Sequence, residues 1–287
     1  MKQFLKKIIF LSLINFIFFR IENVHSVIPY YYLPSIENLQ KESLSVGKDA
    51  YQLLYFGNYK QSLNLAKLAI KLNKEDEKLW LILAEAQIGN KYFKEALNSL
   101  NKAEKINPNI VEIYFAQSNV YIQISELKNA KIALKKGLKI EPNNYKAIFQ
   151  LGNISLMENN YSEAINLFDK SVQIKPDFWQ AINNQALAYF EKNNVNLSIK
   201  LFKKAISIEE NAEPILGLAS CLRMKDIKLA VQLAKQSLDK NPNYVNYKYR
   251  KEQLWGEKLQ NSTETLLKND QLQTDVILAK SKINASS

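Results

Sequence analysis

The sequence has 287 residues with 47% hydrophobic and 23% charged side chains, a composition that excludes an intrinsically disordered chain. One cysteine and one histidine exclude an intrachain disulfide and a cysteine-based zinc cluster, and the scarcity of histidine, the commonest general base, argues against an enzyme. The formal net charge is +11, and seven glycines and seven prolines leave little room for long loops, which favours an all-helical chain.

Residues 1–26 have the regions of a secretory signal peptide. A basic start precedes an apolar run at 8–19, whose 12 residues fall short of the about 20 needed to cross a bilayer. Val24 and Ser26 occupy the −3 and −1 positions, so we expect cleavage after Ser26 and export of the chain. An uncleaved membrane anchor is the alternative, since two charged residues lie between the apolar run and the cleavage point.

Residues 27–42 are predicted to contain a linker and the start of the first helix. Pro29, Pro34 and the absence of a helical period indicate irregular chain up to Ser35, whose side chain is suited to cap a helix N-terminus. Apolar and small residues then recur at steps of three and four, the pattern of one helix face, at Ile36, Leu39, Ser43, Val46 and Ala50.

Between residues 43 and 244 the same kinds of residue recur at a period of about 34. A small residue marks the first half of each unit, at Ala50, Ala84, Ser118, Gly152, Ala186 and Ala219. Another marks the second half, at Ser62, Ala96, Ala130, Ala164, Ser198 and Ala230. Small residues let two helices approach closely. Four of the units end in a proline, which cannot continue a helix, at Pro108, Pro142, Pro176 and Pro242.

The unit at 145–176 carries Leu151-Gly152, Tyr161, Ala164-x-x-x-Phe168 and Pro176, and in this it resembles the tetratricopeptide repeat. The resemblance implies an all-α, right-handed superhelix of about six helix pairs that acts as a protein-interaction scaffold. The units would span 43–76, 77–110, 111–144, 145–178, 179–211 and 212–244. The outer units depart from the pattern, so the number of repeats stays open by one.

Beyond residue 244 the period ends, and 245–287 is predicted to form capping helices, one at 245–267 and one at 271–283. A helical stripe supports the first of them, at Trp255, Leu259, Thr263 and Leu266. The stretch 251–257, KEQLWGE, is similar to the C-terminal region of lumenal repeat proteins of oxygenic phototrophs. This similarity and the signal peptide imply a periplasmic or thylakoid-lumen protein.

In the tetratricopeptide repeat family, the first helix of each pair lines an inner groove that binds peptides. The groove positions here carry amides and phenylalanines, at Phe115, Asn119, Phe149, Gln150, Asn153, Asn183, Asn184 and Phe190. Amides can pair with the backbone of an extended peptide, and phenylalanines can bury its apolar side chains. We expect a peptide-binding groove, with ordinary solvated asparagines as the alternative. No cofactor or metal is expected, and Cys221 is expected to be a buried free thiol.

Lysines recur at one place in the second helix of four successive units, at Lys102, Lys136, Lys170 and Lys204. This outward stripe is either a solvated face or a contact with an anionic membrane surface. A nucleic-acid partner is not expected for an exported protein. The sequence therefore predicts an exported interaction scaffold or assembly factor that binds a partner's peptide segment. The alternative is a membrane-attached structural subunit of an envelope or thylakoid complex.

Overall fold

The computed structural model describes residues 35–285, and every regular element in this range is a helix. The predicted signal peptide at 1–26 and the linker up to Pro34 lie outside the described residues. Ser35 caps the first helix, since its Oγ accepts from the Asn38 N–H at 3.2 Å, as predicted. No helix within 35–285 is long and apolar enough to cross a membrane.

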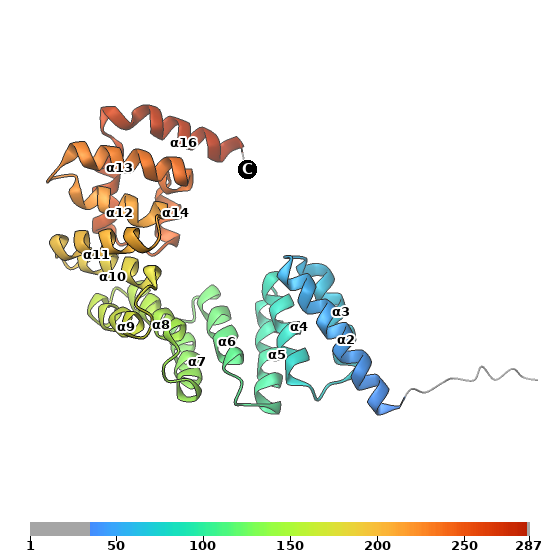
Figure 1. The fold of residues 1–287 in the computed structure, drawn as a ribbon. Coiled ribbons are helices and arrows are strands. Elements are labelled where there is room, and N and C mark those ends of the chain that lie inside the picture. The colour runs from blue at the N-terminus through green and yellow to red at the C-terminus, as the bar shows by residue number, and fades with distance from the viewer. Residues whose placement is uncertain (1–34, 286–287) are drawn as a thin grey trace, which may run out of the picture.

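Helix pairs follow one another from residue 36 to residue 240 and stack side by side into an arc (Figure 1). The pairs are α2 (Ile36–Tyr55) with α3 (Tyr59–Leu72), α4 (Glu77–Gly89) with α5 (Phe93–Ile106), α6 (Val111–Gln123) with α7 (Leu127–Ile140), α8 (Tyr145–Met157) with α9 (Tyr161–Ile174), α10 (Trp179–Glu191) with α11 (Val195–Ile208), and α12 (Ala212–Leu222) with α13 (Ile227–Lys240). The fold is the predicted all-helical solenoid.

Small residues allow the two helices of a pair to pack closely. Ala84, Ala96 and Ala164 are fully buried. A Cβ added to Gly152 would lie 2.5 Å from the Phe168 ring, so the phenylalanine occupies the space that the glycine leaves. Where the small residue of the second helix is a serine, its hydroxyl is satisfied by the facing helix: Ser198 Oγ donates to the Ala186 carbonyl at 2.9 Å. The predicted register of the helix pairs is therefore confirmed.

The turn inside each of the first five pairs contains one residue with positive φ, at Gly57, Lys91, Ser125, Asn159 and Asn193. These residues are spaced at the repeat period, so one turn geometry is reused five times. Asparagine tolerates this left-handed conformation better than most residues, and glycine adopts it without strain. The turn of the sixth pair has no residue with positive φ, because Arg223, the residue after α12, is still helical at a φ of −45°. The sequence is one residue short at this turn.

Consecutive first helices contact one another, for example α4 with α6 and α10 with α12, as expected on the inner side of a curved stack. The first helices therefore present the inner face of the arc.

The region after α13 differs from the predicted pair of capping helices. It contains η1 (Pro242–Val245), α14 (Tyr247–Glu252), α15 (Glu257–Leu267), η2 (Asp270–Leu272) and α16 (Gln273–Ala285). The expected single helix at 245–267 is wrong, because the chain turns at Leu254, which has a φ of 66°, and restarts as a helix after Gly256. This turn places α15 against α10 and α12, on the inner face of the arc.

Candidate functional site

The inner face of the last two repeats is covered by the chain's own segment from Arg250 to Thr263. Trp255, which is buried, donates its indole N–H to the Glu213 carboxyl on α12 at 3.1 Å. Thr263 and Ser220 join their hydroxyls at 2.6 Å and tie α15 to the same helix. A C-terminal segment thus occupies part of the surface on which a peptide ligand was expected, namely the part formed by the fifth repeat.

Glu191, the last residue of α10, holds the start of α15. Its two carboxylate oxygens accept the backbone N–H groups of Lys258 at 3.2 Å and Leu259 at 3.0 Å. The N-cap residue of α15 is Gly256, which has no side chain to satisfy these groups. A Cβ at Gly256 would lie 2.3 Å from the carboxyl carbon of Glu191, so only glycine fits beside this capping carboxylate. A residue of the fifth repeat therefore supplies the cap of a C-terminal helix.

Leu254 extends the contact toward the fourth repeat. Its side chain is half-buried in a cluster with Phe149 on α8 and with Phe178, which precedes α10. The Phe149 and Phe178 rings pack edge to face at 4.9 Å between centroids. The segment therefore crosses the inner side of three repeats, from α8 to α12.

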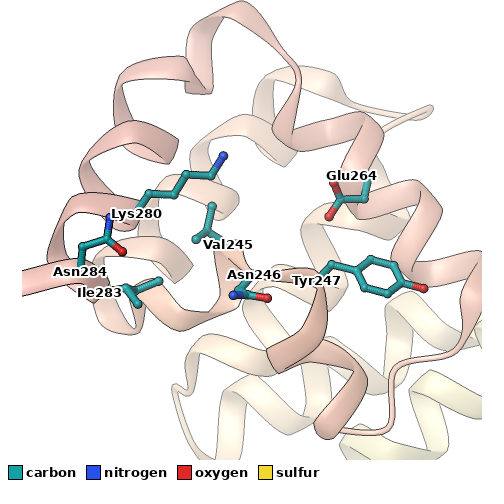
Figure 2. A pocket seen from close by; sticks show the side chains of 7 residues that line it. All are labelled: Val245, Asn246, Tyr247, Glu264, Lys280, Ile283 and Asn284. Carbon is teal, nitrogen blue, oxygen red and sulfur yellow. The ribbon is translucent and has the colours of Figure 1, made fainter. Parts of the chain in front are cut away.

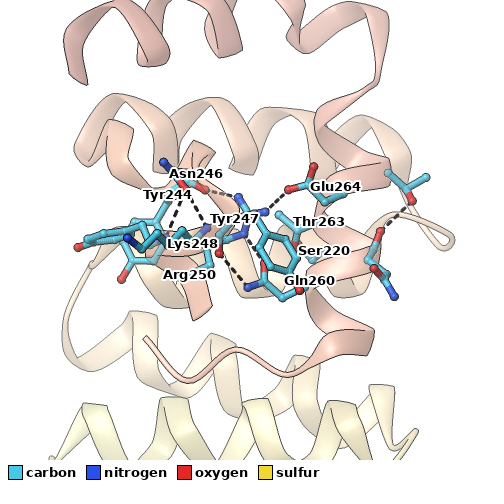
Figure 3. Close-up of polar contacts among 12 residues, drawn as sticks. Ser220, Tyr244, Asn246, Tyr247, Lys248, Arg250, Gln260, Thr263 and Glu264 are labelled. Carbon is cyan, nitrogen blue, oxygen red and sulfur yellow. Dashed lines mark hydrogen bonds and ion pairs between the residues drawn. The ribbon is translucent and has the colours of Figure 1, made fainter. Parts of the chain in front are cut away.

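Arg250 fixes the geometry of this segment, as Figure 3 shows. It is fully buried, and it donates from Nε to Gln260 Oε1 at 2.8 Å and from Nη1 to the Tyr244 carbonyl at 2.6 Å. It also forms an ion pair with Glu264. Burial lowers the pKa of the guanidinium, and the neighbouring Glu264 carboxylate opposes this shift. Arg250 therefore joins α14 to α15 through groups that satisfy a buried charge.

Three of the predicted groove amides meet in one chain of hydrogen bonds. Asn183 donates to Asn184 Oδ1 at 3.1 Å, and Asn184 donates to Asn153 Oδ1 at 2.8 Å. Asn183 is only 1% exposed and Asn184 only 8%. The expectations that these two side chains face an open groove, or that they are ordinary solvated asparagines, are both wrong. The reason is that the C-terminal segment packs over the inner face of α10.

The other predicted groove residues remain accessible to different degrees. Asn119 is exposed, and four residues are half-buried, namely Phe115, Phe149, Gln150 and Phe190. A cavity of about 280 Å³ lies where this surface meets the C-terminal segment, lined among others by Phe149, Asn153, Asn183 and Leu254. The buried Oε1 of Gln150 and Oδ1 of Asn183 have no hydrogen-bond partner within the described residues. Both oxygens lie out of reach of solvent, so each would gain a donor only from a buried water or from a shift of its side chain.

The lysine stripe is partly engaged within the protein. The Lys102 ammonium lies over the Trp80 ring, 4.3 Å from its centroid, and the Lys136 ammonium pairs with Glu104 at 2.8 Å. Lys136 also lies over the Tyr114 ring at 5.6 Å. Two of the four stripe lysines therefore stabilise packing between neighbouring helices, in addition to being exposed.

Cys221 is a buried free thiol, as predicted, and burial raises its pKa to about 12. The thiol form lacks the nucleophilic strength of a thiolate. No group of three or more His, Cys, Asp and Glu residues within 35–285 is placed to hold a metal ion.

A second cavity, of about 410 Å³, lies between η1, α15 and α16 (Figure 2). Lys280 and Glu264 stand on opposite sides of it, and Val245 and Ile283 form its apolar part. Glu264 is paired with Arg250, which joins α14 to α15. The acidic side of this cavity is therefore already used to hold the C-terminal helices together.

The residues that hold the C-terminal segment were missed by sequence reasoning. Glu191 and Glu213 look like ordinary helix carboxylates in the sequence, and their partners lie 42 to 68 residues further along the chain. One available signal was the Trp255-Gly256 pair, since a large aromatic next to a glycine is typical of a close backbone approach.

The sequence matches the model of the tetratricopeptide repeat at residues 77–110, 111–144, 145–178 and 180–211. These bounds agree with the four central predicted units to within one residue. No curated protein sequence matches the chain significantly.

Solved structures share the fold. A tetratricopeptide repeat protein from Parabacteroides merdae ATCC 43184 is 18% identical, with a TM-score of 0.62 over 84% of this chain and 99% of that chain. MamA from Desulfovibrio magneticus RS-1 is 17% identical, with a TM-score of 0.55 over 61% and 98%. Another MamA structure is 24% identical, with a TM-score of 0.52 over 56% and 94%. Identities this low show the fold alone, and residues 77–211 are thus four successive tetratricopeptide repeats within an all-helical solenoid.

Proposed function

We propose that the protein is an interaction scaffold that binds an extended segment of a partner protein on the inner face of α6 and α8. One observation carries the proposal: the chain's own segment at 253–256 already lies against the inner side of α8, α10 and α12 in a non-helical conformation. The same inner face continues into the third and fourth repeats, where the C-terminal segment does not cover Asn119. Concave faces of stacked repeats commonly serve as binding surfaces.

The partner's segment would contact four of the predicted groove residues. Phe115 and Phe149 offer half-buried rings to apolar side chains, and Asn119 and Gln150 offer amides to the peptide backbone. Asn153, Asn183, Asn184 and Phe190 hold or border the C-terminal segment, and in this proposal they set the end of the groove.

The test begins with a pull-down of the protein from its native membranes and identification of captured proteins by mass spectrometry. The captured partner is then titrated against the double variant Asn119→Ala, Gln150→Ala. We expect a loss of about 0.5 to 1.5 kcal/mol of binding free energy for each neutral hydrogen bond. Asn64→Ala, Asn166→Ala is the matched control, since both residues are exposed on second helices. Equal affinity of the two double variants would contradict the groove.

Export to the periplasm or a thylakoid lumen is part of the proposal and is supported by the signal-like residues 1–26 and the 251–257 similarity. The intact mass of protein from its native host tests it. A mature chain beginning at or near Val27 is the expected result. A mass that includes residues 1–26 would favour the alternative, a membrane-attached structural subunit.

The salt dependence of binding distinguishes the interaction scaffold from the membrane-attached subunit. Contacts by amides and aromatic rings should survive moderate salt, whereas membrane attachment through the lysine stripe should weaken because exposed charges are screened. The contacts of Lys102 with Trp80 and of Lys136 with Glu104 favour the scaffold, because these two lysines are already engaged.

A further inference from the structure

A cavity of about 520 Å³ opens between the turn after α12, the helix α15 and the end of α10. Three cationic side chains line it: Arg223 and Lys225 from the turn, and Lys258 from α15. The lining contains no aspartate or glutamate. It is therefore an electropositive cavity, separate from the inner face of α6 and α8.

None of the three cations is paired with a carboxylate in the described part of the chain. Arg223 donates from Nε to Ser262 Oγ at 3.4 Å, and the Lys225 ammonium donates to the Asn196 side chain. Lys258 donates to the backbone carbonyl of Glu191 at 2.7 Å. The Glu191 carboxylate itself is directed at the backbone amides that begin α15. Neutral acceptors leave the charge of Arg223 and Lys225 available to an anion.

The cavity also has an apolar part. Phe190 and Val195 are half-buried in its wall, and Met224, which stands between the two cations in sequence, is 80% exposed. A methionine side chain adapts its shape to varied apolar partners. An occupant that fits this surface carries negative charge beside an apolar side chain.

We infer that this cavity is a second docking site, for an acidic segment of a protein partner. Aspartate or glutamate carboxylates of the segment would pair with Arg223 and Lys225, and an adjacent apolar side chain would pack on Phe190 and Met224. Charge complementarity supports this occupant, since the chain carries a net charge of +11 and the cavity holds cations without carboxylates. The inference rests on the proposed function only in that the partner is a protein.

The probe is a short peptide of alternating aspartate and leucine that carries a fluorophore and a benzophenone. Its asparagine–leucine analogue is the uncharged control. Binding is measured by fluorescence anisotropy with the whole protein and with Arg223→Gln, Lys225→Gln. The matched control is Lys203→Gln, Lys204→Gln, which removes the same charge from exposed positions on α11. Melting curves check that both double variants fold.

We expect the acidic peptide to bind the control variant as it binds the wild type. Arg223→Gln, Lys225→Gln should bind it about tenfold more weakly, because two exposed charge pairs contribute on that order. Photo-crosslinks should map to residues 223–225 and 258–265. The uncharged analogue should bind no more tightly to the wild type than to the pocket variant.

Four outcomes would overturn the site. The first is that the acidic peptide does not bind the wild type. The second is that its affinity falls equally in both double variants. The third is that the crosslinks fall on α6 and α8, which would place the peptide in the proposed groove and leave the proposed function standing. The fourth is that the double variant Arg223→Gln, Lys225→Gln loses binding to phosphatidylglycerol vesicles but still binds the peptide, which would make the cavity a lipid contact. The groove variant Asn119→Ala, Gln150→Ala should keep the acidic peptide, so the two proposals fail independently.

Discussion

Trp255 and Glu213 lie 42 residues apart in sequence and form a buried hydrogen bond at 3.1 Å, from the indole N–H to the carboxyl. The tryptophan comes from the C-terminal segment, and the glutamate comes from the first helix of the sixth pair. This contact joins the repeat array to its C-terminal region through a polar group and a large apolar ring. The stability of the array therefore depends on residues that follow it.

Replacing Trp255 with phenylalanine keeps a ring in the site and removes the N–H donor. Glu213 then loses a partner in a buried place, so we expect the unfolding free energy to fall by about 1 to 3 kcal/mol. Urea denaturation measures the change. Trp179→Phe is the control, since Trp179 is half-buried and its indole makes no hydrogen bond among the described residues. Equal losses in the two variants would mean that the hydrogen bond contributes nothing.

Glu213 should make stability depend on pH. Burial raises the pKa of its carboxyl above the ordinary 4.5, and hydrogen bonds from Trp255, Asn183 and Tyr244 oppose the shift. The native state then binds this proton more tightly than the unfolded state. Its contribution to the unfolding free energy therefore falls as pH rises from 4.5 through the raised native value.

Glu213→Gln removes this titration. The unfolding free energy of the variant relative to wild type should therefore increase with pH, by at most about 1.4 kcal/mol per pH unit. Urea midpoints at several pH values between 4.5 and neutrality measure the difference, and the other carboxyls cancel in the comparison. A difference that stays constant with pH would show that Glu213 keeps the same pKa on folding.

Gly256→Ala should uncap α15. The added methyl group would meet the Glu191 carboxyl, which could then no longer accept from Lys258 and Leu259. A lost cap costs about 0.5 to 2 kcal/mol. Hydrogen exchange of α15 measures the local loss, and Glu191→Gln tests the mechanism in a double-mutant cycle. Strictly additive effects would contradict the idea that the two residues act through one contact.

Ala164→Leu should weaken the whole array. Ala164 is fully buried in the fourth pair, where Phe168 already fills the space beside Gly152. Added methylene groups in a filled core cost about 1 to 3 kcal/mol. Neighbouring repeats share the interface, so the cooperative melting temperature should fall as one transition. Asn166→Leu, at an exposed position two residues away, should leave it nearly unchanged.

Much of the repeat architecture could be predicted because each repeat solves the same local problem. Helix pairing is determined within about 30 residues of chain, by the contact of Gly152 with Phe168 and by the position of Pro176. The helices lie where the repeat period predicts them. The exposure of the groove amides could not be predicted in this way. Whether Asn183 meets solvent depends on a turn at Leu254, which belongs to a different part of the chain and follows no period.

The cap that Glu191 provides for α15 imposes an order on folding during synthesis. The carboxylate accepts from Leu259, 68 residues later in the chain, so the cap cannot form until that residue has emerged from the ribosome. Until then the inner faces of α10 and α12, with the buried Asn183 and Glu213, lack the segment that covers them. A nascent chain at this stage exposes surface that promotes aggregation or chaperone binding. Completion of the solenoid therefore waits for residues that follow the repeats in the chain.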